Sequence, residues 1–249
     1  MSDQATGTGA RLDRQQISAA VSGLGWRLAV GVIRTSVPVE SLAQAADVAR
    51  IATSVAGADG DQSLSADLRP DQVVLTLQSR ADGWVGPREV DLAQRISAAI
   101  GKLGLATEPE AGSRGRGAAG GTRSVQVLEI AIDALDIPAV RPFWKAVLGY
   151  GDEPGHSAGD PGAGVADPVG QGPTIWFQQM DEPRPQRNRI HFDVVVPDDQ
   201  AEHRIRAALD AGGRLINDSE APAFWVLADP EGNEACVCTW LARDAVQGS

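Results

Sequence analysis

The chain has 249 residues, of which 43% are apolar, and this is enough for two modest domains with packed cores. Its 33 acidic and 22 basic side chains give a formal net charge of -11. An acidic surface repels phosphate groups, so nucleic acid and anionic membranes are not expected as partners. No apolar run is long enough to span a membrane, and the N-terminus lacks a signal-peptide pattern. We take Cys236 and Cys238 as reduced thiols and expect a cytoplasmic protein.

A stretch rich in Gly and Ala, residues 106–123, shows no periodicity and predicts a flexible linker. The linker separates a first domain at residues 11–105 from a second domain at residues 124–243. Residues 1–10 are expected to form a disordered lead.

Apolar periodicity in the first domain predicts helices and strands in the order α-β-β-α-β-β-α, which places the chain in the α+β class. The predicted elements are a helix capped by Asp13, strands over 26–30 and 32–39, a helix over 41–55, a hairpin of 65–69 and 73–79, and a helix that begins at Pro87. The apolar face of the second helix is expected to carry Leu42, Ala45, Ala49 and Ala52.

Several segments of this domain resemble pterin-4a-carbinolamine dehydratase. They are Gly25-Trp26, the strand VVLTLQS, and the segment GWVGPREVDLAQRI at residues 83–96. The resemblance implies a dehydratase-like fold, but the family's His-His-Pro falls here on Gln62-Ser63-Leu64 and its later His falls on Arg80. Gln and Ser do not exchange protons near neutral pH, and Arg stays protonated. We therefore expect a degenerate, structural domain, with 4a-hydroxytetrahydrobiopterin dehydratase activity as an alternative.

The second domain reads as two successive β-α-β-β-β units. The first unit is predicted as a strand over 125–133, a helix capped by Asp136 and ended by Gly149, a loop over 151–173 with a short strand near 164–166, and a strand over 174–180. The second unit is predicted as a strand over 190–196, a helix capped by Asp198 and ended at 212–213, and strands over 214–216, 224–227 and 234–240.

The phrases FWKAVLGY, PTIWFQ, RNRIHFDVVVPDD and DPEGNEACV resemble the vicinal oxygen chelate superfamily, which includes glyoxalase-like and bleomycin-resistance proteins. The resemblance implies paired modules, a cupped sheet with a small-molecule pocket, and a homo-oligomer. In the metal-dependent members, the ligand positions correspond here to Glu129, His191 and Cys236, with Gln178 near the fourth position. Cys236 stands where these members usually have a Glu.

Strand alternation adds neighbours to these positions, because residues two apart share a face. Asp193 shares a face with His191, and Trp176 shares one with Gln178. We expect a polar pocket in which His191 and Glu129 form an acid/base pair and Asp193 orients the imidazole.

Gln178, Trp176 and Cys236 are expected to contact the ligand. The alternative is a metal site, with Zn²⁺ or Fe²⁺ held by Glu129, His191 and Cys236. An inward Cys on a core strand is also commonly a small buried apolar residue.

These residues predict a small-molecule enzyme that carries out proton transfer of the lyase, isomerase or cyclase type. A binding protein of the bleomycin-resistance type, which sequesters its ligand, is the alternative. It needs the same pocket but no acid/base geometry.

Overall fold

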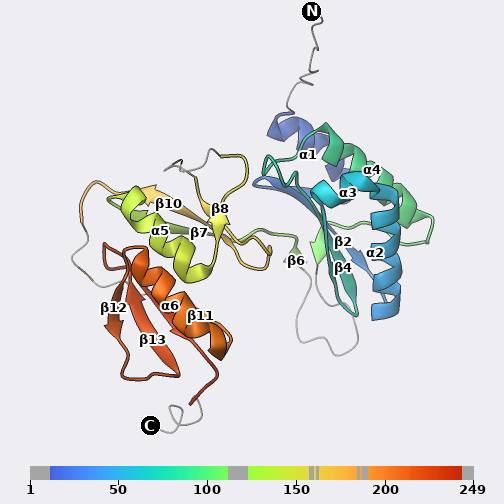
Figure 1. The fold of residues 1–249 in the computed structure, drawn as a ribbon. Helices are drawn as coiled ribbons and strands as arrows, with labels where there is room; N and C mark the ends of the chain where they lie inside the picture. Colours follow the sequence, from blue (N-terminus) through green and yellow to red (C-terminus); the bar gives the residue numbers. More distant parts are fainter. Residues whose placement is uncertain are drawn as a thin grey trace, which may run out of the picture. The chain divides into compact units, whose positions relative to one another are not determined.

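The computed structural model describes residues 12–111, 123–156, 160, 163–183, 186 and 190–242. The chain divides into two compact units, Met1–Val127 and Leu128–Ser249 (Figure 1). Both units combine helices with sheets, so the predicted α+β class is confirmed. The predicted disordered lead and residues 112–122 of the predicted linker lie outside the described residues.

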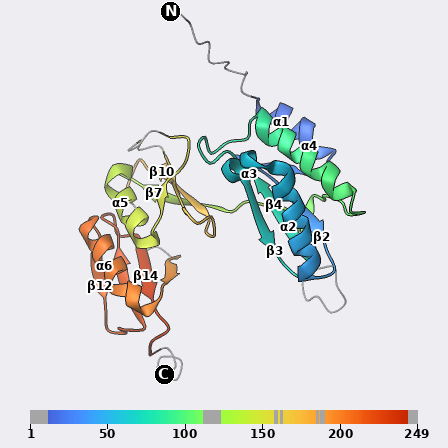
Figure 2. The same cartoon turned by 45° about the vertical axis from the view of Figure 1, so that its right-hand side comes forward.

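The N-terminal unit packs its helices on one face of an antiparallel sheet with strand order β1-β2-β4-β3 (Figure 1). Its elements are α1 (Arg14–Ser22), β1 (Arg27–Ala29), β2 (Val32–Pro38), α2 (Leu42–Ala56), α3 (Ala58–Ser63), β3 (Leu64–Leu68), β4 (Gln72–Leu77) and α4 (Pro87–Gly101). Figure 2 shows α1 and α4 side by side. The predicted element order is confirmed, and the short helix α3 is an addition to it.

Helix α1 begins where the sequence predicts. Asp13 Oδ1 accepts a hydrogen bond from the Gln16 backbone N–H (2.8 Å), and Gln16 Oε1 accepts one from the Asp13 N–H (3.0 Å). This reciprocal pair satisfies N–H groups that the first turn leaves without helical partners. Ile17 and Val21 are fully buried against the sheet.

The predicted apolar face of α2 is wrong at Leu42, and the buried position next to Ala45 is Val48 and not the half-buried Ala49. Leu42 is 55% exposed, whereas Ala45, Val48, Ala52 and Ala56 are buried. These four positions recur at intervals of three or four residues, as one helix face requires. Three of the four are alanine, so the helix backbone approaches its neighbours closely.

The first residues of the predicted linker belong to the N-terminal unit. Ser36 of β2 and Glu108 exchange backbone hydrogen bonds (2.9 and 2.7 Å), and Thr107 Oγ1 donates to the Leu24 carbonyl (2.6 Å). The short strands β5 (Glu110–Ala111) and β6 (Arg123–Ser124) then pair with each other. Local composition predicted a linker here because it does not report contacts between residues that are far apart in the sequence.

The C-terminal unit repeats one arrangement twice. The first module contains β7 (Glu129–Ala134), α5 (Ile137–Leu148), β8 (Gly151–Asp152), β9 (Val165–Ala166) and β10 (Thr174–Gln179). The second contains β11 (Phe192–Val195), the 3₁₀ turn η1 (Asp198–Gln200), α6 (Ala201–Asp210), β12 (Arg214–Asn217), β13 (Phe224–Ala228) and β14 (Glu234–Cys238). The strand orders β7-β10-β9-β8 and β11-β14-β13-β12 are equivalent, which confirms the paired β-α-β-β-β modules.

Helix α5 follows its prediction, but α6 does not. Asp136 accepts from the Ala139 N–H (3.0 Å) at the start of α5, and Gly149 ends it in the left-handed conformation. The predicted cap of α6 by Asp198 is wrong, since the cap residue is Gln200 without a side-chain bond. Asp198 lies in the 3₁₀ turn and accepts instead from Trp240 Nε1 (3.0 Å).

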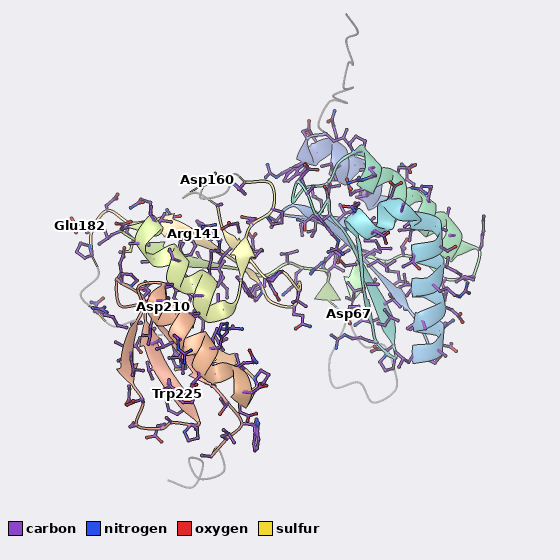
Figure 3. All side chains as sticks on the ribbon, in the orientation of Figure 1. Asp67, Arg141, Asp160, Glu182, Asp210 and Trp225 are labelled. Carbon is purple, nitrogen blue, oxygen red and sulfur yellow. The ribbon has the colours of Figure 1, made fainter. Side chains whose placement is uncertain are left out.

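A buried arginine anchors the loop between β8 and β9. Arg141 lies on α5 (Figure 3), is 8% exposed, and donates to the Ala163 and Gly164 carbonyls and to Asp152 (2.6 Å). Lys145 also donates to Asp152 (2.8 Å). The hydrogen bonds from Lys145 and then Arg141 hold the pKa of Asp152 below its usual value.

The turn between β13 and β14 is built around a fully buried carboxylate. Asp229 accepts from the Trp144 indole (3.0 Å), from the Asn233 side-chain amide (2.7 Å), and from the backbone N–H groups of Glu231 and Asn233. The Glu231 carboxylate accepts in turn from the Leu135 and Asp136 N–H groups (2.9 and 2.6 Å). The second module is thereby tied to the start of α5 in the first.

None of the helices within the described ranges combines the length and the apolar character needed to cross a membrane.

Trp144→Phe keeps an aromatic side chain but removes the indole N–H, which is one donor to the buried Asp229 carboxylate. We expect the free energy of unfolding to fall by about 1 to 3 kcal/mol, the usual result of leaving a buried acceptor short of a partner. Urea unfolding measures the loss. Trp240→Phe is the matched control, because its indole donates to Asp198 at 68% exposure. Its loss should stay under about 0.5 kcal/mol, and equal losses in the two variants would contradict the assignment.

Candidate functional site

Two parallel strands of the second module place polar side chains on one face of its sheet. On β14, Ala235 and Val237 are fully buried in the core shared by both modules, so Cys236 between them points to the opposite face. On β11, Phe192 and Val194 pack against the same core, so Asp193 also points away from it. The strand register sets Asp193 directly beside Cys236.

His191 immediately precedes β11 and completes this group. Its Nε2 lies 3.5 Å from Asp193 Oδ1. One ligand atom each of His191, Asp193 and Cys236 lies within 4.8 Å of the other two. The structure therefore brings together an imidazole, a carboxylate and a thiol on one sheet face.

The three side chains differ sharply in their access to water. The side chains of His191 and Asp193 are 54% and 58% exposed, whereas Cys236 is 7% exposed. Burial, followed by the negative charge of Asp193, raises the pKa of the Cys236 thiol to about 12. The thiol is therefore protonated at neutral pH, and the two exposed groups are the ones that a ligand can reach.

Glu129 lies on a different sheet from this group. It is the first residue of β7 in the first module and pairs with Thr174 of β10. The group of possible metal ligands is therefore His191, Asp193 and Cys236, whereas the sequence suggested His191, Glu129 and Cys236. Burial, followed by repulsion from Glu153, raises the pKa of the Glu129 carboxyl. Glu129 is thus a carboxyl that holds its proton more tightly than an isolated one.

Trp176 and Gln178 occupy the outer face of β10. They pair in register with Ala131 and Asp133 of β7, and Trp176 is 40% exposed. Ile175, the residue before Trp176 on β10, is buried in the core, so the Trp176 ring points to the opposite face of the sheet. The Gln178 amide donates to the Gln179 carbonyl (3.3 Å) and remains exposed. Trp176 offers an apolar surface on the first module's sheet.

The sequence reasoning missed Glu153, whose negative charge acts on Glu129, and the ionisable side chains that lie near Glu153 in the same loop. Glu153 accepts from the Gly164 N–H (3.2 Å), and its Oε2 lies 3.8 Å from His156 Nε2. His156 Nδ1 lies 3.5 Å from Asp160 Oδ2. In the sequence, these contacts are indicated only by the i, i+3 spacing of Glu153 and His156 and the i, i+4 spacing of His156 and Asp160. Such spacings predict contacts in a helix but not in an irregular loop.

The donor set of His191, Asp193 and Cys236 fits a divalent ion. Imidazole nitrogen, carboxylate oxygen and thiolate sulfur are all ligands of zinc, and they also suit iron. The Cys236 thiol must lose its proton on binding, which makes affinity depend on pH. The sulfur donor favours a thiophilic ion, since Mg²⁺ and Ca²⁺ prefer oxygen ligands.

Comparison with known proteins places the C-terminal unit. Residues 129–238 match the family model described as a glyoxalase-like domain. The glyoxalase-like fold predicted for this part of the chain is therefore confirmed. No curated protein gave a match.

Three solved structures are among those similar to parts of the chain. The oxidase ChaP-H2 is 18% identical, with 47% of this chain and 94% of that chain covered and a TM-score of 0.35. The fosfomycin resistance protein FosX from Mesorhizobium loti is 9% identical, with 49% and 96% covered and a TM-score of 0.38. A transcriptional coactivator/pterin dehydratase from Brucella melitensis is 21% identical, with 36% and 97% covered and a TM-score of 0.32.

The raised pKa of Cys236 predicts slow alkylation by iodoacetamide. Moving the pKa from 9.0 to about 12 lowers the thiolate fraction at pH 8 by roughly a thousandfold, and thiolate is the reacting form. The measurement is mass spectrometry of a Cys238→Ser variant, in which Cys236 is the only thiol. Adding Asp193→Asn should speed the reaction, because it removes a negative charge beside the sulfur. Rapid labelling of the folded Cys238→Ser protein would contradict the burial of Cys236.

Proposed function

We propose that the C-terminal unit is a small-molecule enzyme that catalyses proton transfer of the lyase or isomerase type. The observation that carries the proposal is the His191–Asp193 pair, 3.5 Å apart and more than half exposed on the sheet face. Imidazole gives and takes protons near neutral pH, and exposure lets it reach a bound molecule.

The proposed roles follow from the position of each side chain. His191 takes a proton from the ligand on a ring nitrogen, and the Asp193 carboxylate stabilises the imidazolium that forms. Asp193 also fixes the ring's orientation. Cys236 stays a neutral thiol beneath the pair and contributes a weak hydrogen-bond donor.

The first module would supply the remaining contacts to the ligand. Glu129 is the proposed second acid/base group, because its raised pKa helps it to retain a proton for donation. The exposed ring of Trp176 would stack on the ligand, and the Gln178 amide would hydrogen-bond to it.

A metal ion is the alternative occupant of the same group, with His191, Asp193 and Cys236 as its ligands. When bound, such an ion would polarise an oxygen of the small molecule as a Lewis acid. The residues themselves would then hold and orient the ligand.

Metal analysis separates the two candidate ligand sets. If the second module's group holds zinc, the purified chain contains about one zinc per chain, and His191→Ala, Asp193→Asn and Cys236→Ala each lower that content. Glu129→Gln is the matched control and should leave the content unchanged, because Glu129 lies on the other sheet. Loss of zinc in Glu129→Gln with retention in Asp193→Asn would favour the set suggested by the sequence.

The catalytic role of His191 is tested by exchange of carbon-bound protons in D₂O. Small carbonyl compounds such as hydroxyacetone serve as probes, and NMR follows the loss of their C–H signals. We expect His191→Asn to lower the exchange rate by about a hundredfold or more, as removal of a general base does. His203→Asn is the control, because His203 lies exposed on α6. Equal rates in the two variants would remove His191 from the chemistry.

A sequestering protein of the bleomycin-resistance type is the second candidate. Trp176 is 40% exposed and Val195, next to the polar group on β11, is 63% exposed. Exposed apolar groups of this kind suit binding without reaction. Binding of a probe that survives His191→Asn but is lost in Trp176→Ala would favour this candidate over the enzyme.

We also propose that the two compact units are separate domains, and that the N-terminal one has a structural role. Its sequence contains no His, so it lacks the usual acid/base group for pterin dehydration. Assembly into a homo-oligomer and a cytoplasmic location complete the proposal. Both cysteines are free thiols, which is compatible with a reducing compartment.

A further inference from the structure

The N-terminal unit contains a cavity of about 270 Å³ that the proposed function does not use. Its lining residues come from the end of α2, from α3, from the start of β3 and from the segment after β4. They are Thr53, Gly57, Gly60, Asp61, Leu64 and Arg80. Arg80 is one of the positions where the sequence analysis expected a dehydratase histidine, and Leu64 ends the segment aligned with the family's His-His-Pro.

Arg80 brings a positive charge to this cavity without a counter-ion among the described residues. Its Nε donates to the Asp61 carbonyl (3.2 Å), and its Nη2 donates to the Leu64 carbonyl (3.3 Å) and to Ser65 Oγ (3.5 Å). All three acceptors are uncharged. By contrast, Arg69 in the hairpin of β3 and β4 has a charged partner, since its Nη2 lies 3.0 Å from Asp67 Oδ2.

Asp61 brings a negative charge to the same cavity. Its side chain makes no ion pair or hydrogen bond with any residue of the described part of the chain, whereas the adjacent acid Asp59 lies 3.6 Å from Arg95. Asp61 and Arg80 do not pair with each other, although both line the cavity. A cation and an anion thus border one small space with their charges uncompensated by protein groups.

Glycines shape the wall between these charges. Gly57 ends α2 and precedes α3 with a φ of +56°, a conformation that side chains disfavour. A Cβ on Gly60 would approach the Ala56 Cβ to 2.8 Å, so this site accepts only glycine without a shift. Gly57 and Gly60 therefore line the cavity without side chains of their own and leave the space open beside Asp61.

We propose that this cavity binds a small zwitterionic amino acid, with the carboxylate on Arg80 and the ammonium group on Asp61. A guanidinium presents paired donors to a carboxylate, and a carboxylate accepts from an ammonium group. A simple anion would meet repulsion from Asp61, and a simple amine would meet repulsion from Arg80. Both charges stay hydrated, so affinity is weak and falls as salt rises.

The test is an NMR titration of the full chain with L-alanine, propionate and ethylamine. Propionate lacks the amino group of alanine, and ethylamine lacks its carboxylate. We expect L-alanine to cause saturable shifts confined to residues 57–64 and Arg80, with an affinity at least about tenfold above that of either fragment.

Variants assign each half of the ligand. Arg80→Gln should lower the affinity for L-alanine by about tenfold and should not lower the affinity for ethylamine. Asp61→Asn should lower the affinity for L-alanine to a similar extent and should not lower the affinity for propionate. Arg69→Gln is the matched control and should change nothing, because its partner is Asp67. Preserved amide dispersion in each variant shows that the fold survives.

Three outcomes would overturn the proposal. They are the absence of saturable shifts up to the solubility limit of alanine, propionate binding as tightly as alanine, and alanine binding that persists unchanged in Arg80→Gln. The second of these would make the cavity a general anion site.

Discussion

The C-terminal unit depends on one buried carboxylate. Asp229 has no exposed surface, and a charge in that position is tolerable only because the Trp144 indole and neighbouring N–H groups donate to it. Trp144 packs edge-on against Phe143 and Phe192, with ring centroids 5.4 Å apart in each case. The Asp229 carboxylate therefore connects the last hairpin to the helix of the first module, and the Trp144 ring that it holds contacts the first strand of the second module.

The positions of His191, Asp193 and Cys236 relative to one another depend on that connection. The hairpin of β13 and β14 is held at its turn by Asp229, and β14 in turn pairs with β11 in the register that sets Cys236 beside Asp193. A shift of one residue would turn Asp193 towards the core and Phe192 outward. The chemistry proposed for His191 thus depends on core residues that never contact the ligand.

The two units use their charges in different ways. In the C-terminal unit, burial and like charge raise the pKa values of Cys236 and Glu129, so both groups hold their protons more tightly than isolated ones. In the N-terminal unit, Arg80 and Asp61 remain exposed at the edge of a cavity and suit recognition of a charged molecule. A guanidinium such as that of Arg80 does not exchange protons near neutral pH, but it supplies a permanent positive charge.

The sequence by itself determined the longer helices and strands, because apolar periodicity, the caps at Asp13 and Asp136, and the DPEGN turn act over a few residues. It missed the short elements α3, β5, β6 and β8. Local patterns do not say which distant strands become neighbours. Only the tertiary structure decided that His191 meets Asp193 and Cys236 while Glu129 lies on another sheet, since strand pairing follows from packing of the shared core. The same reason explains why the burial of Asp229 and the cavity between Asp61 and Arg80 appear only in three dimensions.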